Sequence, residues 1–357
     1  MTGVGTERSM SGMSQWMDGL LPTPHLLDAS WWFDRRTVEA FSDAVKSLPQ
    51  RAKVVFLGTP SLFLDAWQRA EGRDIWLVDR DEAIKKRLPQ ELQVKFQTRD
   101  LLCAAPCLLG ADLVVADPPW YVEETMAFLA AGQAVARIGA EVQICLPPKG
   151  TRPTIEVERD DLFRWAIAGG LRLTQLLDGE VRYEAPPFEV NVFRSTQQPL
   201  EEQSRSGDLA IFAVDRVQGL VLPGKPVSDG WADHMTLGVR WRVREQAGIG
   251  EGSPELTTLG FSDNIFPSCS KRHAQRAKPD VWTSGNRAFC CQNPQSFLDI
   301  LRSLHGLTLK EVAACAGRLY PSKRSREARA AAQIVTLLEA EQREIEALKQ
   351  CPNGKET

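Results

Sequence analysis

The chain has 357 residues, of which 43% are hydrophobic and 25% charged, and its formal net charge is −3. These values are ordinary for a globular protein and argue against a chain that binds polyanions over its whole surface. No run of about 18 apolar residues occurs, so we expect no transmembrane helix. The first residues lack a basic stretch followed by an apolar core. We therefore expect no secretory signal, and a cytoplasmic protein whose eight cysteines are reduced thiols.

The first half of the chain alternates between strand-like and helical patterns. Residues 1–27 are expected to form a flexible N-terminal segment, because they begin with a stretch rich in Gly, Ser and Met. Compact apolar runs predict strands at 53–58, 74–79, 94–100, 111–117 and 141–148. Helical spacing is seen at 61–70, 82–88, 123–139 and 160–170, and strand-like segments follow over 172–194. Such alternation indicates a parallel α/β sheet.

Four of the predicted strands end on a glycine or an aspartate. These residues are Gly58, Asp79, Asp100 and Asp117. Ligands of open α/β sheets bind outside the carboxyl ends of the strands. The sequence therefore predicts a ligand site at this edge of the sheet.

The tetrapeptide Asp117-Pro118-Pro119-Trp120 directly follows the apolar run "ADLVVA". The prolines stiffen the turn and donate no backbone N–H, which leaves the Pro118 carbonyl able to face a ligand. Asp117 offers a second acceptor, and Trp120 offers a flat aromatic face. Two acceptors beside an aromatic wall suit a planar ligand with an –NH2 group, although a plain strand followed by a proline-rich turn is the alternative.

The first loop, "FLGTPSLF", occupies the place of the glycine-rich turn in nucleotide-binding α/β folds. Gly58 permits a tight turn, and the helix that follows Pro60 offers free N–H groups. Thr59 or Ser61 could cap that helix. The loop lacks the Gly-x-Gly fingerprint, so a simple strand–turn–helix remains possible.

Asp79 and Asp100 end the second and third predicted strands. An acidic residue at the position of Asp79 can accept hydrogen bonds from both ribose hydroxyls of an adenosine-type cofactor. The neighbouring Asp81 is more simply explained as a residue at a helix start. Asp100 could meet the adenine amino group, or could equally cap a helix.

Residues 28–194 resemble the N6-adenine methyltransferase-like family, which includes lysine methyltransferases of translation elongation factor 1A. The matching segments are "SWWFDRRTVEAF", "VVFLGTPSLF", "WLVDRDE" and "LVVADPPWYVEET". The resemblance implies a Rossmann-like fold with a reversed last strand, in a domain spanning 28–195. It implies S-adenosylmethionine (SAM) bound by the first loop and Asp79. It also implies a target amine held by Asp117-Pro118-Pro119-Trp120.

Two features depart from the family and leave the acceptor open. Trp120 stands where the family more usually has Phe, and in this it resembles the motif of adenine methyltransferases of RNA and DNA. The chain also continues well beyond the domain. Adenine in nucleic acid is the leading acceptor and protein lysine the second. A non-catalytic methyltransferase-like scaffold or SAM sensor is a third hypothesis, and a branched-polyamine synthase is a distant one.

The second half predicts a linker at 196–208 and a mixed C-terminal domain at 209–357, β-rich first and then helical. Segment 271–329 contains twelve Lys and Arg against four Asp and Glu, a formal net charge of +8 that leaves −11 for the rest of the chain. This asymmetry predicts a nucleic-acid partner, with a solvated basic face on a helical bundle as the alternative. Residues 297–324 look somewhat like a helix-turn-helix. No metal site is predicted, because Cys269, His273, Cys290 and Cys291 lack a regular ligand spacing.

Overall fold

The computed structural model describes residues 20–196, 204–217, 219–221, 230–245, 252–312, 314 and 325–350. The chain divides into two compact units. The first consists of Met1–Pro22, Trp32–Glu184 and Ser204–Val227, and the second of Thr23–Trp31, Ala185–Gln203 and Ser228–Thr357. Among the described residues, no helix is both long enough and apolar enough to cross a bilayer.

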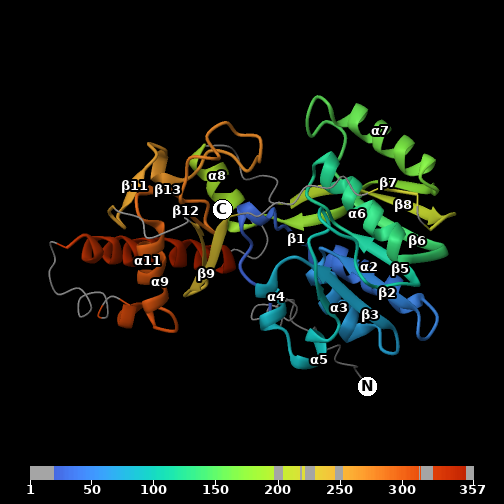
Figure 1. The fold of residues 1–357 in the computed structure, drawn as a ribbon, viewed down its shortest axis with the longest axis horizontal. Helices are drawn as coiled ribbons and strands as arrows, with labels where there is room; N and C mark the ends of the chain where they lie inside the picture. The colour runs from blue at the N-terminus through green and yellow to red at the C-terminus, as the bar shows by residue number, and fades with distance from the viewer. Residues whose placement is uncertain are drawn as a thin grey trace, which may run out of the picture. The chain divides into compact units, whose positions relative to one another are not determined.

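An eight-stranded sheet forms the centre of the first unit (Figure 1). Its strand order is β1-β7-β8-β6-β5-β2-β3-β4. Strands β2 to β6 run parallel, whereas β8 is antiparallel to both of its neighbours. This arrangement confirms the predicted α/β fold with a reversed last strand. The strands are β1 Trp32–Phe33, β2 Lys53–Leu57, β3 Asp74–Asp79, β4 Phe96–Thr98, β5 Ala111–Ala116, β6 Ala136–Leu146, β7 Leu171–Glu184 and β8 Ser204–Val214.

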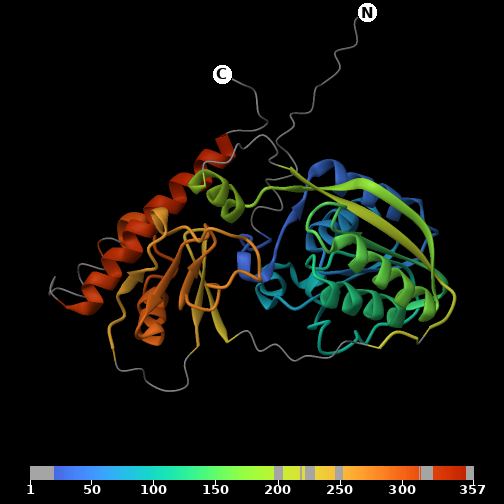
Figure 2. The same cartoon turned by 90° about the horizontal axis from the view of Figure 1, so that it is seen from above.

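Helices cover both faces of this sheet (Figure 2). The chain passes from β2 to β3 in one direction across the sheet and from β5 to β6 in the other. Right-handed crossovers therefore place α3 and α6 on opposite faces. Helix α2 packs on α3, and α7 packs on α6. The helices are α2 Arg35–Ser47, α3 Pro60–Arg69, α4 Glu82–Arg87, α5 Gln90–Gln93, α6 Val122–Val135 and α7 Ile155–Ala168.

Local sequence explains where α2 begins and which face it buries. Asp34 is the N-cap, and its carboxylate accepts a hydrogen bond of 2.8 Å from the backbone N–H of Thr37. Val38, Phe41 and Val45 then recur at helical spacing and are all buried. The helix is therefore specified both by its cap and by its apolar stripe.

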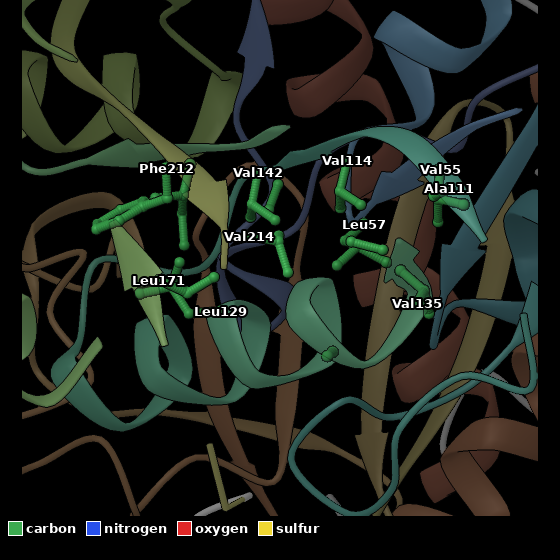
Figure 3. Packing of buried hydrophobic residues seen from close by; sticks show 14 of the residues in the cluster. Val55, Leu57, Ala111, Val114, Leu129, Val135, Val142, Leu171, Phe212 and Val214 are labelled. Carbon is green, nitrogen blue, oxygen red and sulfur yellow. The ribbon is translucent and has the colours of Figure 1, made fainter. Parts of the chain in front are cut away.

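The core of the first unit lies between the central strands and α6 (Figure 3). Val55, Val114 and Val142 come from three adjacent strands and are fully buried, as are Leu129 and Val135 of α6. Strands covered on both faces read as continuous apolar runs, which is why "KVVFL" and "ADLVVA" could be predicted. Each such side chain contributes about 1.5–3 kcal/mol by leaving water.

The second unit contains a five-stranded antiparallel sheet of order β11-β13-β12-β10-β9. Buried Trp241, Phe297 and Ile334 join this sheet to the helices that cover it. Asn293 is the N-cap of helix α9, and its side chain accepts a hydrogen bond from the N–H of Ser296. The elements are η1 Leu26–Asp28, α8 Pro187–Ser195, β9 Trp231–Thr236, β10 Val239–Arg244, β11 Leu256–Thr258, η2 Ser262–Asn264, β12 Val281–Thr283, β13 Ala288–Cys291, α9 Pro294–Ser303 and α11 Arg326–Gln350.

Two segment boundaries differ from those expected from the sequence. Strand β8 begins at Ser204, inside the expected linker 196–208, and pairs with β6 and β7 instead of opening a domain at 209. Alternation reveals a strand but not which sheet it joins, so the pattern alone misplaced it. Leu21, His25 and Leu26 are buried, so the end of the expected flexible segment 1–27 is packed. Residues 1–19 lie outside the described part.

Two element types also differ. The helix expected over 123–139 ends at Val135, and β6 begins at Ala136 without an intervening loop. Helical spacing continues through this stretch, but pairing with β5 and a positive φ of 79° at Gly139 override it. Residues 187–195, expected to be strand-like, form helix α8, with a proline in its first turn.

Candidate active site

The strand ends that the sequence singled out meet at one edge of the first sheet. Leu57 pairs with both Val78 and Ala116 in parallel registers, and Asp79 pairs with Thr98. Strands β2, β3, β4 and β5 therefore end side by side. The residues that follow or end them are Gly58, Asp79, Asp100 and Asp117.

Gly58 is the close-approach point of this edge. Its φ is +66°, and a Cβ there would lie 2.9 Å from the Phe128 ring and 3.4 Å from the backbone oxygen of Asp117. The left-handed conformation and the crowding both require glycine. The first loop is thereby held against the start of the Asp-Pro-Pro-Trp segment.

The loop that leads from Gly58 into α3 contains a buried hydroxyl, that of Thr59, without a hydrogen-bond partner among the described residues. Pro60 is the first residue of α3, and Thr59 precedes it but makes no side-chain capping hydrogen bond, contrary to expectation. Thr59 is 1% exposed and Ser61 4% exposed. The Thr59 hydroxyl has no hydrogen-bond partner in the described structure. An unsatisfied buried hydroxyl costs about 1–3 kcal/mol, so a ligand that supplied a partner would be favoured here.

Asp79 and Asp100 have different local roles. Asp79 accepts a 2.8 Å hydrogen bond from the N–H of Asp81, and Asp81 itself caps α4. The helix is therefore capped by Asp81 and not by Asp79, which agrees with the expectation that Asp81 marks the helix start. Asp100 accepts from the N–H of Leu102 at 3.0 Å and so stabilises the turn after β4. Among the described residues, no helix lies between β4 and β5, so the expected alternative of a helix cap at Asp100 is wrong, and its contact stabilises a turn instead.

Asp117 contacts a residue that the sequence did not single out. The hydroxyl of Tyr183, on β7, donates a 2.8 Å hydrogen bond to Oδ1 of Asp117. The Tyr183 ring is stacked on Phe33, with centroids 4.8 Å apart and planes at 27°. Trp120 meets Tyr183 edge-on, at 5.8 Å and 78°. Strands β7 and β5 are distant in sequence, so no local pattern could pair Tyr183 with Asp117. The only sequence signal for this contact was the tyrosine itself, at the start of "YEAPPF".

The pKa values of three side chains in this cluster are raised by burial. Burial raises the pKa of Asp117 to about 7, and the Tyr183 hydrogen bond opposes part of that rise. Burial also raises the pKa of Tyr183 and of the neighbouring Cys145 well above their ordinary values. Tyr183 and Cys145 thus stay neutral donors, while Asp117 exchanges a proton in the physiological range.

The remainder of the tetrapeptide is fixed by its backbone. No described residue donates a hydrogen bond to the Pro118 carbonyl, whereas the Pro119 carbonyl accepts from Tyr121 N at 2.6 Å. The Trp120 carbonyl accepts from Arg152 at 2.9 Å, and the Arg205 guanidinium lies 5.9 Å from the Trp120 ring centroid. The turn is therefore rigid around one carbonyl that receives no hydrogen bond from the described residues, and the Trp120 ring contacts both Tyr183 and Arg205.

The chain contains a second Pro-Pro-aromatic segment, Pro186-Pro187-Phe188. Its residues belong to the second unit, where Phe188, Glu189 and Asn191 of α8 are buried. Glu189 accepts from the Trp31 indole at 2.9 Å, and Asn191 donates to the Gly285 carbonyl. The strand-like conformation expected here is wrong, because Pro186 is the N-cap and Pro187 the first residue of a helix.

The cysteines considered for a metal do not form a centre. No group of three or more potential ligands converges among the described residues. Cys290 and Cys291 hold raised pKa values, with burial as the main cause. Such thiols are protonated at neutral pH and are poor metal ligands.

The basic segment 271–329 contains two kinds of basic residue. Arg272 and Lys278 are exposed in the loop before β12. Arg287 is instead buried, with an ion pair of 2.5 Å to Glu344, and so adds nothing to the surface charge. The predicted helix-turn-helix begins on α9, but residues 313 and 315–324 lie outside the described part.

Comparison with known proteins agrees with this architecture. Residues 28–145 match a family model described as "Probable N6-adenine methyltransferase", which confirms the predicted family resemblance over that segment. No curated protein sequence matches the chain at a significant level.

Several solved structures are similar at low identity. The branched-chain polyamine synthase from Thermus thermophilus is 15% identical, with 60% of this chain and 67% of that chain covered and a TM-score of 0.49. A TehB-like SAM-dependent methyltransferase from Corynebacterium glutamicum is 14% identical, with 51% and 89% covered and a TM-score of 0.36. The N-methyltransferase NodS from Bradyrhizobium japonicum is 12% identical, with 58% and 100% covered and a TM-score of 0.36. The fold assignment itself comes from the strand order.

Proposed function

We propose, from the match of residues 28–145 to the N6-adenine methyltransferase family, that this protein transfers a methyl group from SAM to an amino group. The acceptor we favour is the amine of adenine in a nucleic acid. One observation carries the proposal. Asp117 and the Pro118 carbonyl present adjacent acceptors at the carboxyl edge of the sheet, and no described residue donates to that carbonyl. Two acceptors match the two N–H bonds of an –NH2 group.

The first loop and two strand ends are proposed to hold SAM. The tight turn at Gly58 and the start of α3 offer backbone N–H groups, and the buried Thr59 hydroxyl lacks a partner. Asp79, at the end of β3, is proposed to accept hydrogen bonds from the ribose hydroxyls. Asp100 follows β4 beside it and is proposed to face the adenine of the cofactor.

The chemistry asks mainly for positioning. SAM supplies an electrophilic methyl group on a sulfonium. Asp117 and the Pro118 carbonyl would orient the acceptor nitrogen so that its lone pair points at that carbon. As the N–C bond forms and the C–S bond breaks, the nitrogen releases a proton, which Asp117 can accept because its pKa is about 7.

Protein lysine is the second candidate, and one observation favours it. A lysine ammonium must lose a proton before it can attack, and a carboxylate with a pKa near 7 is a better base than an ordinary one. The exposed basic residues of the loop before β12 favour nucleic acid instead. We therefore propose a nucleic-acid partner for segment 271–329.

The direct test has two stages. Calorimetric titration with SAM is expected to show micromolar binding that Asp79→Ala abolishes and Asp160→Ala, an exposed change on α7, preserves. Incubation with labelled SAM and RNA, DNA or protein pools is then expected to label adenine, with product masses identifying the transferred group. Absence of SAM binding by the unmodified chain would refute the proposal, and labelled lysine would select the second candidate.

A further inference from the structure

Tyr183 is the largest side chain of the amine site that the family resemblance does not account for. It is 2% exposed and lies near the end of β7. The ring has an aromatic neighbour in Phe33, which stacks on it, and another in Trp120, which meets it edge-on. Its orientation is therefore fixed before any ligand binds.

The contact with Asp117 divides the two oxygens of that carboxylate. Oδ1 accepts the Tyr183 hydroxyl at 2.8 Å. Within the described part of the chain, no hydrogen bond to Oδ2 is found. A carboxylate with one oxygen anchored cannot rotate about its χ2 angle without breaking that hydrogen bond.

We propose that Tyr183 is a positioning residue that anchors Oδ1 of Asp117, so that Oδ2 is presented to the acceptor amine beside the Pro118 carbonyl. The inference rests on the proposed function, because it concerns the same amine site. It adds a fifth strand, β7, to a site that sequence motifs confine to β2, β3, β4 and β5.

The surroundings of Tyr183 keep its hydroxyl protonated, so the hydroxyl acts as a donor to Asp117. Cys145, on β6, is a neighbour of Tyr183, and its thiol remains neutral because burial raises its pKa. Arg205, on β8, pairs with Tyr183 of β7 and lies over the Trp120 ring. Because the hydroxyl keeps its proton, it stabilises the ionised form of Asp117 and holds it ready to accept from an amine.

The experiment compares Tyr183→Phe with Thr174→Val in the full-length protein. Tyr183→Phe keeps the ring and removes the donor. Thr174→Val removes a hydroxyl from the same strand, one that donates to the Ile211 carbonyl away from the site. The Asp117 pKa is measured directly by ¹³C NMR of the labelled carboxyl, assigned with Asp117→Asn. SAM affinity and the pH dependence of methyl transfer are measured in parallel.

We expect the Asp117 pKa to rise by about one unit in Tyr183→Phe and to stay unchanged in Thr174→Val. The acidic limb of the kcat profile should move up by the same amount, and kcat at neutral pH should fall on the order of ten-fold, with SAM affinity unchanged. An unchanged Asp117 pKa, or a shifted pKa with unchanged kcat, would overturn the inference. Because the NMR readout needs no turnover, failure of the proposed activity would be recognised separately.

Discussion

The carboxylate of Glu341 lies directly against Gly285 in the second unit. A Cβ at position 285 would be 2.8 Å from both Cδ and Oε1 of Glu341. Gly285 N donates to Oε2 of that carboxylate at 3.1 Å, and the Thr283 hydroxyl donates to Oε1. Helix α11 is thereby joined to the turn between β12 and β13.

Replacing Gly285 by alanine should destabilise the second unit. The added methyl group meets a buried carboxylate that is held by two hydrogen bonds, and overpacking of this kind costs about 1–3 kcal/mol. Urea unfolding would measure the loss. The double variant Gly285→Ala with Glu341→Ala should lose less than the sum of the two single variants, because the second change removes the atom that the first one strikes. Strict additivity would contradict the contact.

Glu341 should make stability fall as the pH rises. Burial raises its folded-state pKa to about 7 from an ordinary value of 4.5. The stabilisation from the protonated form is complete below about pH 4.5 and is lost as the pH rises through 7, at a cost of about 3 kcal/mol. Asp117, whose folded-state pKa is also raised to about 7, adds a decline of the same sign in the first unit. Glu341→Gln should therefore reduce the decline in unfolding free energy between pH 5 and 8 by about 3 kcal/mol and leave the part that Asp117 contributes.

Glu339→Gln is the matched control for this pH effect, because Glu339 lies exposed on the same helix. Its unfolding profile should follow that of the unmodified protein. Glu344 pairs with Arg287, and its lowered pKa acts at more acidic pH, outside this window. A decline of unchanged size in Glu341→Gln would show that Glu341 does not titrate in this window.

Asp117→Asn should uncouple SAM binding from methyl transfer. The amide keeps the shape of the side chain but cannot accept a proton, so we expect transfer to fall by at least about 100-fold while SAM affinity changes little. In the unmodified protein the rate should also fall as the pH drops below about 7, since protonated Asp117 no longer accepts. Transfer that survived in Asp117→Asn would place the amine elsewhere.

The loop before β12 should contribute salt-dependent affinity for nucleic acid. Arg272→Ala combined with Lys278→Ala should weaken binding similarly for all sequences and reduce the salt slope by about two, because each contact releases a counterion. Fluorescence anisotropy at several salt concentrations would measure both effects. Lys46→Ala, an exposed basic change on α2, should leave the slope unchanged. Equal slopes in all variants would move the contact surface away from this loop.

The sequence by itself determined the parallel strands of the first unit and the polar residues at their ends. It could do so because strands buried on both faces are read as apolar runs, and ligand-facing residues follow them at fixed positions. Gly58, Asp79 and Asp117 were found in this way. The likeness of "LVVADPPWYVEET" to a known family came from the same stretch.

The tertiary structure alone decided what depends on distant pairing. Strand β8 was assigned to the wrong sheet, and Tyr183 was overlooked beside Asp117, although 66 positions separate the two residues. Burial of Arg287 likewise could not be seen in a count of charges. The physical reason is common to all three. A residue's local pattern reports its own backbone conformation, whereas its partners, its desolvation and its pKa are set by chain segments that meet only after folding.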